Sequence, residues 1–295
     1  MLKRRAFLKY SLLGLGGCSL AKGPSLPLTG QQKHPEKLRF AVTDLSGLDT
    51  LEQDFGQFRE VLAEVLALPV EFFPVENYTA AAPALLANEL DFAMAGPSEY
   101  LLLRARANAV PIVGVTRSNY YTMVMTRVGS GIQTLADLKN KTIAMRTKGS
   151  TAGHIVPMKM LLDAGVSPQD YEVQMLNREG ADALRSGQVD AWTDSFSRYT
   201  EYVKEPGLKG TEIQVIASSD PLPPDLFVAN PSLGDEFIEN LQLRMIEYKT
   251  ALLEALSASK ANAKYITSDM IAVQDADYQA LRDSYYAIGQ GSAIE

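Results

Sequence analysis

Short apolar runs alternate with longer amphipathic stretches along most of the chain. Residues 38–42 (Leu-Arg-Phe-Ala-Val) form an apolar run, and apolar side chains then recur at every third or fourth position over residues 51–66. The first pattern predicts a strand and the second a helix. The alternation continues with predicted strands at 70–75 and 91–95 and helices at 78–87 and from residue 98. Strands that alternate with helices in this way predict a parallel α/β sheet.

The same alternation starts again after residue 120 and predicts a second α/β unit of similar size. The expected strands lie at 121–126, 142–145, 173–176 and 189–192, and the expected helical segments at 135–138, 155–164 and 180–186. Residues 235–258 and 277–288 are largely helical in pattern and could pack on either unit. The fold class is therefore α/β with two lobes, and no repeat of fixed period is present.

The first 17 residues have the layout of an export signal. They contain four basic residues and no acidic one, and their apolar run is too short to span a bilayer. The pair Arg4-Arg5 is similar to a twin-arginine signal, and residues 15–18 (Leu-Gly-Gly-Cys) are similar to a lipobox. We therefore expect residues 1–17 to be removed and Cys18 to carry a lipid anchor. The alternative is a basic tail with a buried cysteine.

Residues 18–37 are rich in Gly, Pro, Gln and Lys, which favours a flexible tether. No later apolar run reaches the roughly 20 residues that a spanning helix needs. We therefore expect an exported protein that is held at the membrane surface, on its periplasmic face, by the lipid on Cys18 and does not span the bilayer.

Charge and ligand-type residues exclude several classes of protein. From residue 18 onward the chain has 24 basic and 35 acidic residues, a balance of −11 that disfavours nucleic-acid binding. One Cys and two His are too few for a disulfide framework, a zinc finger or an iron–sulfur site. We expect no metal and no cofactor, and any bound anion must be held by local donors.

Catalytic motifs are missing or incomplete. Residues 149–153 resemble a nucleophile elbow, but Thr151 stands where that motif needs serine. Residues 257–260 match Ser-x-x-Lys without a companion motif, and His154 has no carboxylate at a motif spacing. The sequence therefore favours a binding protein over an enzyme.

The segment 147–157 (Thr-Lys-Gly-Ser-Thr-Ala-Gly-His-Ile-Val-Pro) follows a predicted strand and opens a predicted helix. Free backbone N–H groups and the positive end of the helix dipole meet at such a start, and Ser150 and Thr151 add hydroxyl donors. A phosphate, phosphonate or sulfonate group, whose three oxygens each need donors, fits this arrangement without Lys or Arg. The same hydroxyls could instead only cap their own helix.

Through this segment and its flanks the sequence resembles the PhnD-type phosphonate-binding proteins of ABC importers. The similarity lies in residues 120–124, 130–144 and 150–153 with Pro157 and Leu161, and in the flanking segments 77–80, 88–93, 96–100, 187–191 and 222–225. It is collinear from about residue 38 to about residue 260. The resemblance implies the type II periplasmic binding fold, in which two lobes enclose a ligand cleft. It further implies a first lobe of residues 38–120 plus 228–295 and a second lobe of residues 121–227.

The resemblance also implies a set of ligand-binding positions. Those that match the family pattern are Tyr78, Tyr120, Ser150, Thr151 and Asp225. The family's aspartate, here Asp225, is thought to pair with a substrate amine or an acidic P–OH, although it could merely cap a turn. Residues with a weaker expectation of ligand contact are Tyr100, Tyr121 and Arg146.

Two positions depart from the family pattern. The third residue of the helix cap is Ala152, which keeps its backbone N–H and lacks a hydroxyl. The family's histidine falls at Asn177, or at Arg178 if the alignment shifts by one residue. Arg146 could supply the positive charge that these two positions lack. The departures leave the expected fold intact and leave the identity of the oxyanion open.

The implied function is the capture of a phosphonate, phosphite or related phosphorus oxyanion for an ABC importer. Binding would shift an open–closed equilibrium of a monomer, and the closed form would dock on the permease, which works with an ATPase subunit. One alternative is a sensor that reports a small oxyanion to a signalling partner, which neighbouring genes would distinguish. A second alternative is an enzyme on the same fold, which would need a reactive side chain in the cleft.

Overall fold

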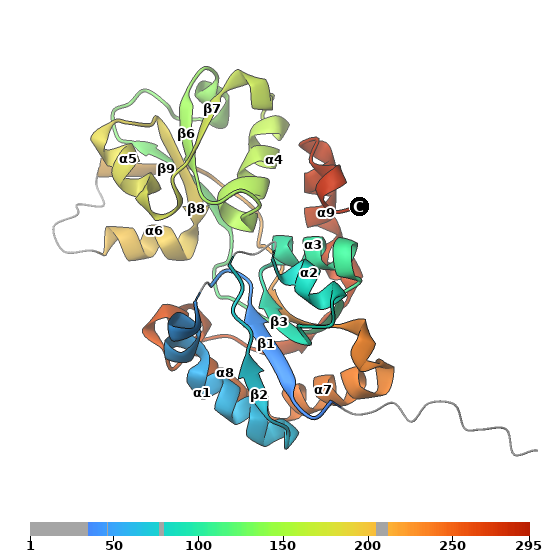
Figure 1. Ribbon diagram of the computed structural model, residues 1–295. Helices are drawn as coiled ribbons and strands as arrows, with labels where there is room; N and C mark the ends of the chain where they lie inside the picture. The colour runs from blue at the N-terminus through green and yellow to red at the C-terminus, as the bar shows by residue number, and fades with distance from the viewer. Residues whose placement is uncertain (1–34, 46, 77–79, 205–211) are drawn as a thin grey trace, which may run out of the picture. The chain divides into compact units, whose positions relative to one another are not determined.

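The computed structural model describes residues 35–45, 47–76, 80–204 and 212–295. Two β-sheets organise this part of the chain (Figure 1). The first has six strands in the order β11-β4-β10-β3-β1-β2. Its strands are β1 (Leu38–Val42), β2 (Val70–Phe72), β3 (Phe92–Ala95), β4 (Val110–Val115), β10 (Asp225–Ala229) and β11 (Met270–Ala272). Strands β1, β2 and β3 are parallel, whereas β10 runs antiparallel to both β3 and β4.

The second sheet has five strands in the order β7-β6-β8-β5-β9. Its strands are β5 (Thr122–Arg127), β6 (Thr142–Met145), β7 (Glu172–Met175), β8 (Ala191–Ser195) and β9 (Ile213–Ser218). Strand β6 pairs in parallel with β7 and β8, while β5 is antiparallel to β8 and β9. Both sheets are therefore mixed. The prediction of a parallel sheet is wrong for β10 and β11 in the first sheet and for β5 in the second, which run antiparallel to the strands beside them.

Helices connect and cover these strands. They are α1 (Leu48–Leu66), α2 (Ala81–Leu86), α3 (Pro97–Ala107), α4 (Val156–Asp163), α5 (Gly180–Ser186), α6 (Phe196–Val203), α7 (Asp235–Glu247), α8 (Lys249–Leu256) and α9 (Gln279–Ala287). Among the described residues no helix is both long enough and apolar enough to cross a membrane.

The first sheet is buried on both faces, and its strands show why the sequence reads as continuous apolar runs. Along β1 the large side chains of Leu38, Phe40 and Val42 pack with α1, α7 and α8, whereas Ala41 belongs to the cluster on the opposite face. Phe40 lies 5.3 Å from Phe92 and 5.7 Å from Phe58 between ring centroids. Large residues thus fill one face, and alanines on the other let α2 and α3 approach closely.

The second sheet is also covered on both faces. Ile143 and Met145 of β6 pack with α4, whereas Ala144 lies on the other face beside Trp192 and α5. A Cβ atom on Gly180, the first residue of α5, would lie only 2.7 Å from the Trp192 ring. Glycine at this position therefore lets the indole pack directly against the helix backbone.

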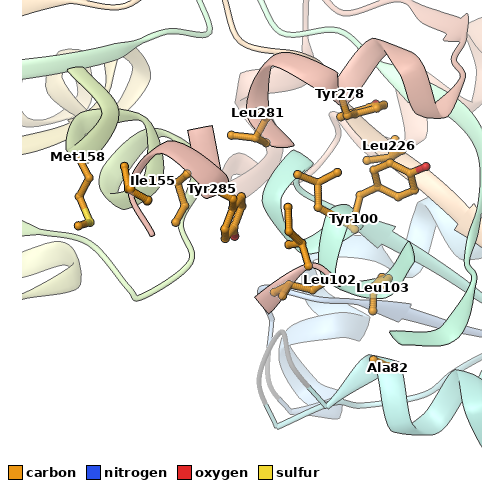
Figure 2. Packing of buried hydrophobic residues seen from close by; sticks show 14 of the residues in the cluster. Ala82, Tyr100, Leu102, Leu103, Ile155, Met158, Leu226, Tyr278, Leu281 and Tyr285 are labelled. Atoms are coloured by element: carbon orange, nitrogen blue, oxygen red, sulfur yellow. The ribbon is translucent and has the colours of Figure 1, made fainter. Parts of the chain in front are cut away.

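Helix α9 joins the cores of the two lobes (Figure 2). Its residues Leu281 and Tyr285 belong to one buried cluster that includes Ile155 and Met158 near α4 and also Tyr100 of α3. Gln290, just beyond α9, donates a hydrogen bond to the Met158 sulfur at 3.7 Å. The C-terminal segment therefore packs against both sheets' helices rather than against one lobe alone.

The chain passes between the sheets through two extended segments that run side by side. The Leu222 N–H donates to the Tyr120 carbonyl at 2.8 Å, and the Ser219 N–H donates to the Thr122 carbonyl at 3.0 Å. The boundary expected between residues 227 and 228 falls inside β10, all of which pairs with β3 and β4 of the first sheet. The second passage therefore precedes Asp225.

Candidate functional site

A cavity of about 230 Å³ lies where the carboxyl ends of parallel strands from both sheets meet. The first sheet contributes residues that follow β1 and β3, and the second contributes residues that follow β6, β7 and β8. Ligands of α/β sheets bind at this edge because the turns and helix starts gather there. The topology itself thus places polar side chains from distant segments around one space.

The helix start predicted at residues 147–157 forms one wall of this cavity, with Ser150 and Thr151 in the lining. A single π-helical turn, η2 (Thr151–Ile155), leads into α4. Its first N–H groups have no acceptor within the helix, as at any helix start. Ser150 Oγ accepts a hydrogen bond from the Gly153 N–H at 3.3 Å, which holds the turn. Donors at this turn therefore face a space that an anion could fill.

Thr151 connects the two lobes. Its hydroxyl donates to Ser98 Oγ at 2.9 Å and accepts from the Ser98 N–H at 3.1 Å, and both residues are buried. Ser98 lies in the first turn of α3, beside the first sheet. The Thr151 hydroxyl is thus already engaged between the lobes, so its role in this conformation is to join them.

His154 holds the loop before this turn by a hydrogen bond to its backbone. Its Nδ1 accepts the Gly149 N–H at 3.1 Å, and the ring is almost completely buried. Burial, with a smaller contribution from the Lys148 charge, lowers the pKa of His154 to about 4. The imidazole is therefore neutral at pH 7 and shapes the loop, in keeping with the structural role favoured by the sequence.

A buried ion pair lies between the first sheet and the passage to the second. Asp225, at the start of β10, accepts a hydrogen bond from the Tyr265 hydroxyl at 2.6 Å and lies 3.4 Å from the Arg117 guanidinium. Lys264 Nζ is 4.0 Å from the same carboxylate oxygen. Burial is the largest influence on the Arg117 pKa and lowers it, but the charge of Asp225 together with smaller contributions from Tyr120, Tyr265 and Asp44 outweighs burial, so the pKa is raised. The negative charge of Asp225 is thus balanced by cationic residues of the protein itself.

Tyr120 lies against this ion pair. The Arg117 guanidinium carbon is 3.7 Å from the centre of the Tyr120 ring, a close cation–π contact. Burial raises the pKa of the Tyr120 hydroxyl, so it remains a neutral hydrogen-bond donor. Tyr120 and Arg117 form a rigid corner of the cavity.

Glu99 provides a carboxyl on the first-lobe wall. Burial and, to a smaller extent, the charges of Asp44 and Asp225 raise its pKa, while Arg146 and the Gly96 N–H oppose the rise, and the pKa is raised to about 8 in all. At pH 7 the carboxyl is therefore largely protonated and can donate a hydrogen bond to an oxyanion. Gly96 accommodates this carboxyl, because a Cβ there would overlap the Glu99 oxygen.

Three arginines of the second lobe line the same cavity. Arg146 follows β6, Arg178 lies in the 3-10 turn η4 (Asn177–Glu179) after β7, and Arg198 lies in the first turn of α6 after β8. The Arg146 Nε donates to Asn177 Oδ1 at 3.4 Å, and Arg198 pairs with Glu201 at 2.8 Å. Burial and, to a smaller extent, the charges of Arg146 and Arg178 lower the pKa of Arg198, while the carboxylate of Glu201 opposes this effect.

The expected site residues divide into three groups. Those that line the cavity are Tyr120, Ser150, Thr151, Asp225 and Arg146. Those that lie outside its lining are Ala152, Asn177, Tyr100 and Tyr121. Tyr78 and Cys18 lie outside the described residues.

Each residue outside the lining has another contact. Tyr100 is buried and donates to Asp275 at 2.6 Å, and Tyr121 packs on Phe196 with 5.1 Å between ring centroids. The Ala152 carbonyl accepts from Thr122, and Asn177 adopts a positive φ of 46° while it positions Arg146. These contacts place the four residues around the site as supports of its walls.

Residues that the sequence reasoning did not single out as binding positions include Arg117, Arg198, Lys264 and Glu99. The arginines of the second lobe carry a usable signal, because each follows the end of a strand that the hydrophobic pattern predicts. Arg117 and Lys264 carry no such signal, since they meet Asp225 only through the passage between lobes and a C-terminal turn. The sequence shows that the helix start suits an oxyanion without Lys or Arg, but in the structure these cations line the same cavity.

Comparisons with known proteins agree with this architecture. The family described as "ABC transporter, phosphonate, periplasmic substrate-binding protein" matches residues 40–278. The phosphate-import protein PhnD of Mycolicibacterium smegmatis is 23% identical over 277 residues, 86% of each chain. This match confirms the resemblance to the PhnD family and the expectation of a binding protein rather than an enzyme.

Solved structures confirm the two-lobed α/β fold. PhnD1 of Prochlorococcus marinus in complex with methylphosphonate superposes with a TM-score of 0.69 at 17% identity, covering 86% of this chain and 99% of that one. XAC2383 of Xanthomonas citri bound to ATP gives a TM-score of 0.73 at 13% identity, covering 88% and 98%. At these identities the similarity establishes the fold.

Proposed function

Because the chain belongs to the family of periplasmic phosphonate-binding proteins of ABC transporters, we propose that its cavity captures a phosphonate, phosphite or related phosphorus oxyanion for import. The observation that carries the proposal is the set of donors that converge from both lobes, with Ser150 and Arg146 on one wall and the neutral Glu99 carboxyl on the other. Charge-assisted hydrogen bonds from such donors suit the three oxygens of a phosphorus oxyanion.

The two walls of the cavity would contact the ligand one after the other. The second-lobe wall offers an anion positive charge and hydroxyl donors, so the ligand binds there first. Tyr120 and Glu99 then complete the hydrogen bonds as the lobes close, and the Ser98–Thr151 pair forms at the base of the cleft. Binding stabilises the closed form by its extra contacts, as population shift requires.

Delivery requires export and a transporter partner. On this proposal residues 1–17 direct export, Cys18 carries a lipid anchor, residues 18–37 act as a tether, and the closed monomer docks on the permease, which an ATPase subunit drives. A Cys18→Ser variant is expected to move from the membrane fraction to the soluble periplasmic fraction while its ligand affinity stays unchanged. Retention of that variant in the membrane fraction would contradict the anchor.

The ligand is tested by calorimetry on the protein from residue 30 onward, with methylphosphonate, phosphite, phosphate, a sulfonate and sulfate. We expect one or more phosphorus oxyanions to bind without turnover and to raise the melting temperature. Ser150→Ala should weaken that binding about three- to tenfold, the effect of one lost hydrogen bond. Ser232→Ala is the matched control, because Ser232 is exposed and does not line the cavity.

Two results would overturn the proposal. One is the absence of binding by all phosphorus oxyanions while the protein remains folded. The other is consumption of a phosphonate in a timed product assay, which would favour an enzyme on this fold. A sensor role would be favoured if binding is found but the gene lies beside a signalling gene and apart from permease and ATPase genes.

A further inference from the structure

We infer that the ligand carries a second anionic group, which Arg178 binds at a subsite next to the phosphoryl position. The inference rests on the proposed function and specifies the class of phosphorus compound that the cavity takes. A phosphonate with a carboxylate or a second phosphoryl group a few bonds away has this chemistry.

The first support is the placement of the cations. Arg146, Arg178 and Arg198 follow three neighbouring parallel strands, and β6, which leads to Ser150, is the middle one. Neighbouring strands are about 4.8 Å apart, so the backbones that carry Arg178 and Arg198 start roughly 10 Å apart. One phosphoryl group at the Ser150 turn sits between them. A second anionic group on the same ligand would reach the guanidinium on one side, that of Arg178, because Arg198 on the other side is already paired with Glu201.

The second support is the state of each cation's partners. Arg117 and Lys264 face Asp225, and Arg198 pairs with Glu201. Within the described part of the chain, Arg146 and Arg178 have no carboxylate within 4.0 Å. The buried Asp194 on β8 offsets part of the charge of Arg146 and Arg198, which leaves the positive excess of this wall greatest at Arg178. An anion that spans the wall removes the repulsion among its guanidiniums.

The third support is that no unpaired, ionised acid of the described lining lies on the arginine wall, where an amine would need one. Asp225 is occupied by Arg117 and the Tyr265 hydroxyl, and Glu201 by Arg198. Asp54 accepts a hydrogen bond from Ser259 at 2.6 Å, and Glu99 is largely protonated at pH 7, so Asp44 and Asp54 of the first-lobe wall are the ionised acids without a cationic partner among the described residues that line the cavity. An ammonium group near the three arginines would therefore be repelled.

The size of the cavity agrees with a ligand larger than phosphite or methylphosphonate. A space of about 230 Å³ holds roughly eight water molecules at about 30 Å³ each. Methylphosphonate has only five non-hydrogen atoms, so it leaves room for a short chain with a second charged group. The cavity thus has both the space and the charge that such a ligand requires.

The test compares three phosphonates of similar length and different charge: 3-phosphonopropionate, its neutral amide 3-phosphonopropionamide, and 2-aminoethylphosphonate. Calorimetry should give the carboxylate at least tenfold tighter binding than the amide, and the amine the weakest binding. The ratio of carboxylate to amide affinity should fall to near one in Arg178→Gln. It should stay unchanged in Arg185→Gln, an exposed arginine on α5 that does not line the cavity.

The outcomes separate this inference from the proposed function. Equal binding of carboxylate and amide, or a ratio that Arg178→Gln does not change, overturns the second anionic subsite while phosphonate binding stands. Failure of all three compounds and of methylphosphonate and phosphite overturns both. If a 1,2-bisphosphonate binds more tightly than 3-phosphonopropionate, the second anionic group of the ligand is a phosphoryl group rather than a carboxylate.

Discussion

The two walls of the cavity differ in how they carry charge. The second-lobe wall holds three arginines with Glu201 as their one acidic neighbour in the described lining, together with the hydroxyls of the Ser150 turn. The first-lobe wall holds four carboxyl groups, those of Asp44, Asp54, Glu99 and Asp225. An anion is therefore attracted by one wall and would be repelled by the other if its acids were free.

The first-lobe wall avoids this repulsion in two ways. Asp225 is paired with Arg117 and Tyr265, and Glu99 is neutral at pH 7 because burial raises its pKa. A chain with an acidic balance can therefore hold an anion when its acids are paired or protonated locally. Under the proposed function, the second lobe provides the attraction for the anion, and the first lobe provides closure with little opposing charge.

The largest expected effect comes from breaking the buried ion pair. Asp225→Ala leaves Arg117 buried without its carboxylate and the Tyr265 hydroxyl without its acceptor, which should lower the free energy of unfolding by about 3–5 kcal/mol. Urea denaturation measures this loss. The control is Glu71→Gln, which removes the exposed Lys37–Glu71 pair and should cost under about 1 kcal/mol. Similar losses in both variants would contradict a special role for the buried pair.

The next effect concerns the second-lobe turn. His154 has a pKa of about 4 in the folded protein against an ordinary value of 6.5, so the unfolded chain binds the proton more readily. The stability from neutral His154 is complete above pH 6.5 and is lost as the pH falls toward 4, by about 3 kcal/mol.

His154→Asn tests this pH-dependent part of the stability, because the asparagine side-chain oxygen can accept the Gly149 N–H and does not titrate. Denaturation curves from pH 7 to pH 4 should show a smaller acid loss in the variant than in the parent protein. Identical pH profiles would show that the imidazole does not stay neutral in the fold.

A third effect tests the neutral carboxyl of the first lobe. As the pH rises through about 8, Glu99 loses its proton, so a hydrogen-bond donor becomes a negative charge beside the ligand. Affinity for a phosphonate should then fall by up to tenfold per pH unit. Glu99→Gln keeps a neutral donor, and its affinity should fall much less between pH 7 and pH 9. Calorimetry at several pH values measures both proteins with the same ligand, whose own titration then cancels.

The smallest effect concerns the exposed acid. Asp44→Asn removes a negative charge from the first-lobe wall and should raise phosphonate affinity two- to fivefold at low salt, and less at high salt, because solvent and ions screen exposed charges. Asp49→Asn, on the same segment and outside the cavity lining, should change affinity little. An equal gain in affinity in both variants would show that the overall negative charge of the chain opposes binding, rather than the position of Asp44 on the cavity wall.

The hydrophobic pattern predicts most local elements because their apolar periods are regular. Residues 38–42 and 142–145 form strands, and residues 180–186 form a helix, as expected. The pattern cannot predict that β10 inserts between β3 and β4, because that pairing joins segments more than 100 residues apart. Long-range pairing therefore explains why the antiparallel strands were not expected.

The site, too, has residues whose position the sequence predicts and residues whose state it does not. Ser150 and Arg146 follow a predicted strand, so their place in the cavity follows from topology. The neutral state of Glu99 depends on burial against Gly96 and on distant acids, which no local pattern contains. The family resemblance is confirmed, whereas contact of each named residue with ligand stays a prediction.

Helix α9 offers a way to follow closure from outside the cavity. Because Leu281 and Tyr285 pack in a cluster shared with residues of both lobes, a change in the angle between the lobes must shift α9 against one of them (Figure 2). Its backbone amides should therefore exchange with deuterium more slowly when ligand holds the closed form. The C-terminal helix is thus a natural reporter of occupancy that needs no attached dye.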